Sequence, residues 1–120
     1  MTFATTVDAL HGYVEQLAQL QSVVGQPEMS QHASTLQRFF NQTLWLRLVQ
    51  VELSQHQAQW RSATTELHRH MRLLAVEINF VQSARHSDKR QQRLAQLEQR
   101  LQQLQGFAQV LIKLCSSRDL

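Results

Sequence analysis

The side chains of this sequence best suited to catalysis or metal binding are its six histidines. His68 and His70 lie on either side of Arg69, and residues two positions apart on a helix point in different directions. Glu66 and His70 have the i,i+4 spacing of metal ligands that share a helix, but no second pair of ligands accompanies them. We therefore expect solvated histidines at or near the surface and no metal site.

Other catalytic patterns are also missing. Cys115 falls on the apolar face of the last predicted helix, whereas a reactive thiol needs a partly exposed, electropositive setting. Gly12, Gly25 and Gly106 are scattered singly, so no glycine-rich loop is available to bind phosphate. No serine occupies a strand–turn–helix elbow, and the paired Glu-x-x-His motifs of di-iron bundles are absent. The sequence predicts a protein that is not an enzyme, with no catalytic residue and no cofactor.

A group of basic residues is the first feature that could bind a partner. These residues are Arg85, His86, Lys89, Arg90 and Arg93. They could form a docking surface for an acidic segment of another protein, or they could be a solvated helix end. Nucleic acid is an unlikely partner, because no aromatic residues alternate with the arginines and because Glu66, Glu77 and Asp88 dilute the charge.

Residues 44–53 are the second candidate, because they hold more apolar side chains than one helix face can bury. The apolar residues are Leu44, Trp45, Leu46, Leu48, Val49, Val51 and Leu53. The surplus around Trp45, Leu48 and Val49 could stay exposed as a protein interface, where tryptophan is favoured. Alternatively, the helix is buried on two sides, or a homodimer covers the surplus.

Four helices would position these residues. Apolar residues recur at three- and four-residue steps, which predicts helices over about 5–24 and 28–53 and two further helices around 60–81 and 94–115. Gly25 and Pro27 fit a helix stop and start, whereas the polar residues 54–59 leave the next boundary open. Ser87 is the expected N-cap of the fourth helix, with Asp88 in its first turn, so the hairpin tip should lie near 85–88.

The stripes of the last two helices have heptad spacing. They are Trp60, Thr64, Leu67, Met71, Leu74, Ile78 and Val81, and then Leu94, Leu97, Leu101, Leu104, Ala108, Leu111 and Cys115. With three glycines and one proline, the chain lacks the frequent turns of a β-rich fold. The predicted fold class is all-α: an antiparallel four-helix bundle with long heptad-patterned helices, forming a single domain over residues 1–120.

Charge and location give further expectations. Residues 1–60 hold two basic and four acidic residues, whereas residues 61–120 hold ten and five, so an acidic partner would be attracted to the second half. The first residues lack the basic and apolar regions of a signal peptide, and no apolar run is long enough to cross a bilayer. We expect a cytoplasmic protein that does not contact membranes.

The third and fourth predicted helices share features with a known family. These are the Arg-Leu-Leu run at Arg72, the acidic Glu77, the segment Phe80-Val-Gln-Ser-Ala-Arg85, and the spacing of Arg93, Leu97, Arg100 and Leu101. In these features, residues 67–114 resemble PatD, the cyanobacterial heterocyst frequency control family. The sequence departs from the family pattern at Phe107 and Ala108, where an aromatic residue followed by cysteine is expected.

The resemblance implies a small helical cytoplasmic protein that modulates assembly of FtsZ, the tubulin-like cell-division protein. Through FtsZ it would influence how often vegetative cells differentiate. The resemblance supplies no binding residues, so the partner-binding residues that we predict come from the two candidate surfaces alone. The alternatives that stay open are a nucleic-acid-binding regulator and a purely structural helical oligomer.

Overall fold

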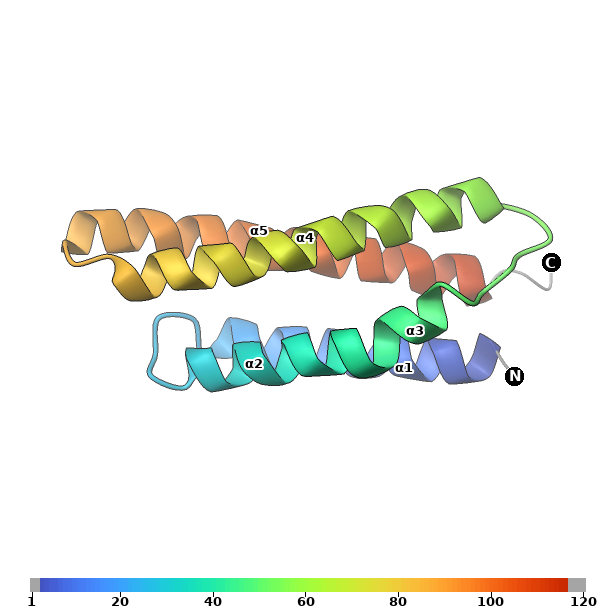
Figure 1. The fold of residues 1–120 in the computed structure, drawn as a ribbon, viewed down its shortest axis with the longest axis horizontal. Coiled ribbons are helices and arrows are strands. Elements are labelled where there is room, and N and C mark those ends of the chain that lie inside the picture. Colours follow the sequence, from blue (N-terminus) through green and yellow to red (C-terminus); the bar gives the residue numbers. More distant parts are fainter. Residues whose placement is uncertain (1–2, 117–120) are drawn as a thin grey trace.

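A computed structural model describes residues 3–116, with side chains from residue 5 onward, and all of its regular elements are helical (Figure 1). The elements are α1 (Phe3–Ser22), α2 (Met29–Phe39), the π-helical turn η1 (Phe40–Leu44), α3 (Trp45–Leu48), α4 (Gln57–Ser83) and α5 (Ser87–Ser116). Because α2, η1 and α3 follow one another without a break, the described chain forms four long helical segments. The prediction of an all-α protein is confirmed.

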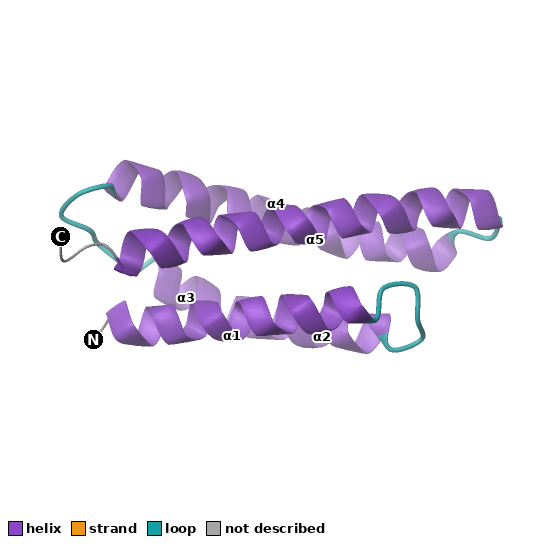
Figure 2. Cartoon of the chain, turned by 180° about the vertical axis from the view of Figure 1, so that it is seen from behind, coloured by secondary structure: helices purple, strands orange, loops and turns teal. Residues whose placement is uncertain are grey.

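The helices lie lengthwise in an elongated molecule of 51 × 21 × 18 Å. In both views α4 runs alongside α5, and α1 runs alongside the segment that contains α2 (Figures 1 and 2). Contact between α1 and α5 joins the two pairs most extensively, and α2 also touches α4. The connection between α4 and α5 lies at one end of the molecule, beyond the loop that joins α1 to α2 (Figure 1).

The core follows the predicted stripes of α4 and α5. Every residue of the Trp60–Val81 stripe is buried, and so is every residue of the second stripe except Leu94, which packs against the core while half-buried. In α1 the buried face includes Tyr13 and Ala9, while Val7 and Val14 are only half-buried. The Tyr13 hydroxyl donates a hydrogen bond of 3.0 Å to Sδ of Met71, so its polar group has a partner inside the core.

The second helical segment ends earlier than predicted. Helical structure stops at Leu48, and residues 49–56 form a connection that ends in a left-handed residue, His56, with φ of 66°. The Trp60 indole N–H donates to the Leu48 carbonyl at 3.0 Å, and the Gln57 side chain accepts from the Leu53 N–H at 2.6 Å. Side chains of α4 thus satisfy backbone groups that a longer helix would have paired internally.

The other boundaries are close to the predicted ones. Gly25 has φ of 82°, as expected of a residue that ends a helix, and α2 begins at Met29. Ser87, the predicted N-cap, is instead the first residue of α5, so His86 precedes the helix. The His86 carbonyl accepts a hydrogen bond from the Arg90 N–H at 2.9 Å. Asp88 lies in the first turn of α5, where its charge is favourable.

Candidate functional site

The basic residues of the α4–α5 hairpin surround an exposed aromatic ring. Phe80 lies in the last turn of α4 and is 44% exposed, and the Arg93 guanidinium carbon lies 4.7 Å from its ring centroid. A surface pocket is lined by Phe80, Ser83, Ala84, Arg85, His86, Lys89 and Arg93. We call these seven residues the hairpin site.

The backbone explains why these side chains meet. Only residues 84–86 separate the two helices, so the last turn of α4 lies close to the first turns of α5. Lys89 and Arg93 are four residues apart and share one face of α5. Arg85, Lys89 and Arg93 give the hairpin site three permanent positive charges, while Asp88 is an exposed acidic neighbour. An exposed cation–π contact such as that of Arg93 with Phe80 is worth about 0.5–1 kcal/mol.

Arg90 does not belong to this group. Its side chain is half-buried and lines a different pocket, with Gly25, Pro27 and Val81 among the lining residues. Nη2 of Arg90 donates to the Gly25 carbonyl at 3.5 Å, which ties the α4–α5 hairpin to the connection between α1 and α2. Arg90 therefore lies apart from the hairpin site, and its role in partner binding stays a prediction.

The apolar residues of 44–53 divide between the core and the surface. Leu48 is the last residue of α3, and its side chain is buried in the core, with 1% exposure. It cannot contribute to an exposed interface. Trp45 is half-buried, and its ring packs at a tilt of 41° against that of His68, with a centroid distance of 4.4 Å. The exposed members are Val49, at 55%, and Leu46, at 53%, so the exposed apolar surface includes Leu46 in addition to the predicted Val49.

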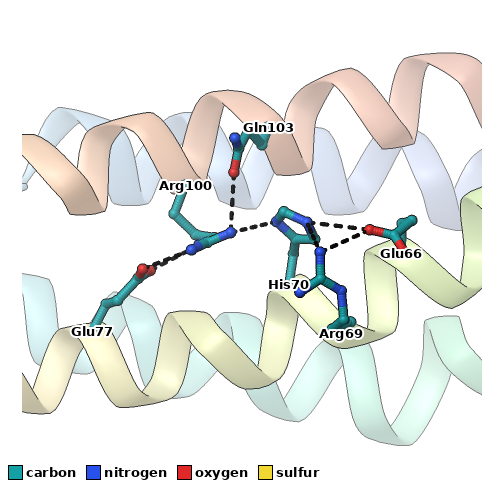
Figure 3. A network of polar contacts seen from close by, with 6 residues as sticks. All are labelled: Glu66, Arg69, His70, Glu77, Arg100 and Gln103. Carbon is teal, nitrogen blue, oxygen red and sulfur yellow. Dashed lines mark hydrogen bonds and ion pairs between the residues drawn. The ribbon is translucent and has the colours of Figure 1, made fainter.

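A polar network joins the middle of α4 to α5 (Figure 3). Arg100 donates through Nε and Nη2 to the two carboxylate oxygens of Glu77, at 2.9 and 2.8 Å. Its Nη1 lies 2.6 Å from Nδ1 of His70 and 3.1 Å from Oε1 of Gln103. The Arg100 and Glu77 side chains are only 18% and 17% exposed, so this is a shielded, bidentate ion pair.

His70 is the histidine that departs from the surface prediction, because only 6% of it is exposed. Arginine can only donate hydrogen bonds, so Nδ1 accepts from Arg100 at 2.6 Å. The other ring nitrogen, Nε2, lies 3.5 Å from Oε1 of Glu66 and 3.3 Å from Nη2 of Arg69. Burial lowers the pKa of His70, and the neighbouring charges of Arg100 and Arg69 lower it further. Glu66 opposes that shift but does not reverse it.

Within the described residues 3–116, no group of three or more histidine, cysteine, aspartate or glutamate side chains is arranged to hold a metal ion. Among the helices of that same range, none combines the length and apolar character needed to cross a membrane.

Comparison of this chain with protein-family models, with curated proteins and with solved structures finds no significant match.

Proposed function

We propose that this chain is a non-enzymatic regulatory protein that binds another protein through the hairpin site. The observation that carries the proposal is the exposed Phe80 ring with Arg93 over it, at an end of the molecule where Arg85 and Lys89 add positive charge. Aromatic and arginine side chains dominate the binding energy of many protein interfaces. An exposed pair of this kind favours an acidic partner surface.

The partner that we propose is FtsZ, on the strength of the resemblance of residues 67–114 to PatD. In this proposal the protein acts in the cytoplasm of a cyanobacterium, alters FtsZ assembly and so affects cell division and the frequency of heterocyst differentiation. We also propose the finer architecture, an antiparallel four-helix bundle whose seams follow heptads. The extensive contact between α4 and α5 supports it.

Two alternative functions each have one observation in their favour. The aromatic ring of Phe80 lies among the cations, where the sequence had suggested no aromatic residue, and this favours a nucleic-acid-binding regulator. Against it, Arg93 already lies over the ring on which a base would stack. The exposed Leu46 and Val49 favour a structural oligomer or homodimer.

Sedimentation of FtsZ with GTP tests the proposal. The wild-type protein should change the amount of FtsZ in the pellet, and the variant R85E/K89E should not, because the charge of the hairpin site is reversed. The matched control is R61E/K113E, which makes the same charge change at two exposed positions outside the site. No effect of the wild type would refute the FtsZ proposal, and equal effects of both variants would refute binding through the hairpin site.

A further inference from the structure

An exposed apolar strip continues from the hairpin site along α4. Val76 is 45% exposed and Phe80 is 44% exposed, and Leu73 beside them is half-buried. Their spacing of three and four residues places the three side chains on one face of the helix. At 1.5 Å per residue, the strip extends about 10 Å along the helix axis.

Positive charge lies at both ends of this strip. Arg72 is exposed one turn before Val76, and the cations of the hairpin site lie beyond Phe80. The acidic residues of this part of α4 are already engaged. Glu66 pairs with Arg69 at 3.0 Å, and both carboxylate oxygens of Glu77 accept hydrogen bonds from Arg100 (Figure 3).

The pairing of Glu77 matters for what can bind. Glu77 lies four residues after Leu73 and three before Phe80, so it is next to the strip on the helix surface. An unpaired Glu77 carboxylate would therefore repel an acidic partner at the strip. Arg100 neutralises that carboxylate and holds it toward α5, at 17% exposure. Arg100 therefore acts as a positioning residue that keeps the surface both apolar and positively charged.

We infer that this strip and the hairpin site together dock an acidic amphipathic helix of a partner protein. Apolar side chains of that helix, at three- and four-residue steps, would pack over Val76 and Phe80, as a helix packs its apolar face on a complementary surface. Its carboxylates would face Arg72 at one end and Lys89 and Arg93 at the other.

A nucleic acid fits this surface less well than a helix. A phosphate backbone would use the cations but would place charged groups over Val76 and Leu73, which offer no polar contact. The inference rests on the proposed function in one respect, since it names the chemistry of the partner at the same hairpin site. It does not require that the partner is FtsZ.

Isotope-labelled protein titrated with synthetic peptides tests the inference by NMR. The first peptide contains leucine at three- and four-residue steps with glutamate elsewhere, and the second has the same composition with the leucines dispersed around the helix. A third replaces glutamate with lysine. We expect the patterned acidic peptide to shift the signals of residues 72–93 and to bind about 10-fold more tightly than either of the others.

Two variants of the protein test whether the peptide contacts the apolar strip. V76E should weaken binding of the patterned acidic peptide by about 10-fold, because it places a carboxylate in the apolar strip. V49E adds the same charge at another exposed valine, outside the strip, and should leave binding unchanged. Equal binding of all three peptides, no binding of the first, or shifts centred on Leu46 and Val49 would each overturn the inference. Tighter binding of a short DNA duplex to the same residues would overturn it in favour of nucleic acid.

The two proposals fail separately. If the patterned acidic peptide does not bind while the wild type changes FtsZ sedimentation and R85E/K89E does not, the proposed function stands and the helix-docking inference fails. If the patterned peptide binds at the strip but the protein leaves FtsZ unchanged, the docking surface stands and the FtsZ proposal fails.

Discussion

Nη1 of Arg100 lies 2.6 Å from Nδ1 of the buried His70, which requires that this imidazole nitrogen accept the hydrogen bond and carry no proton. A second guanidinium, that of Arg69, lies 3.3 Å from the other ring nitrogen. The contact therefore links the protonation state of one side chain in α4 to the position of one side chain in α5. Protonation of His70 would place a third positive charge between the two arginines.

The first prediction is that acid destabilises the fold through His70. The pKa of His70 is lower in the folded protein than its ordinary value of 6.5, so the unfolded chain binds the proton more readily. The contribution of neutral His70 to the stability of the fold is fully present above about pH 6.5, its pKa in the unfolded chain. This contribution is lost as the pH falls from there toward the pKa of His70 in the folded protein. Thermal unfolding measured between neutral and mildly acidic pH should show the decline.

Two variants separate this effect from general acid sensitivity. H70Q keeps an acceptor for Arg100 and does not titrate, so the decline across this pH range should become shallower. H86Q removes an exposed histidine of the hairpin and should leave the decline as in the wild type. Glu66, whose pKa is lowered by its hydrogen bond to Arg69, loses its stabilising contribution only at more acidic pH. An unchanged slope in H70Q would rule out His70 as the source.

The sequence predicted the last two helices well, because their contacts repeat along the chain. Leu67, Leu74, Leu97 and Leu104 belong to apolar stripes with helical spacing, and that spacing alone determines which face is buried. The hairpin tip followed from the same stripes and from the polar residues between them. Clustering of Arg85, Lys89 and Arg93 was also predictable, since a short connection must bring the ends of two helices together.

Other features depend on contacts between distant residues. The end of helical structure at Leu48 is fixed partly by the indole of Trp60, which no local pattern at 44–53 reveals. The burial of His70 depends on the register of α4 against α5, which brings Arg100 opposite it. Residues at similar distances from the tip of a hairpin face each other, and His70 and Arg100 each lie 15 residues from residue 85, the middle of the connection. The ion pair of Glu77 with Arg100 does not follow from this rule, because Glu77 lies only eight residues before the same point.

The second prediction concerns that pair. Replacing Arg100 with methionine leaves the shielded carboxylate of Glu77 without its bidentate partner and His70 without its donor. We expect R100M to lower the free energy of unfolding by about 2–4 kcal/mol, measured by chemical denaturation. The double variant E77M/R100M removes both charges and should recover part of that loss. If the double variant is less stable than R100M, the unpaired carboxylate is not the cause.

The third prediction contrasts two glycines. Gly25 has φ of 82°, a conformation that disfavours a side chain, although an added Cβ would lie 3.6 Å from the nearest Leu94 atom without a clash. G25A should therefore destabilise the protein by about 1–2 kcal/mol through backbone strain. Gly106 lies within α5, where an added Cβ meets nothing within 4 Å, so G106A should stabilise by about 0.5–1 kcal/mol. Thermal unfolding of both variants distinguishes these opposite signs, and stabilisation by G25A would contradict the assigned strain.

The fourth prediction uses the single tyrosine of the chain as a probe of the core. Burial raises the pKa of Tyr13 well above its ordinary value, because the phenolate would lose its hydration. In an alkaline titration, tyrosinate absorbance should therefore develop together with the loss of helical circular dichroism, not before it. Y13F removes the donor to Met71 while filling the same space, and should cost less than about 1.5 kcal/mol, whereas Y13A leaves a cavity and should cost about 3–5 kcal/mol. Ionisation of Tyr13 in the fully helical protein would show that solvent reaches its hydroxyl between α1 and α4.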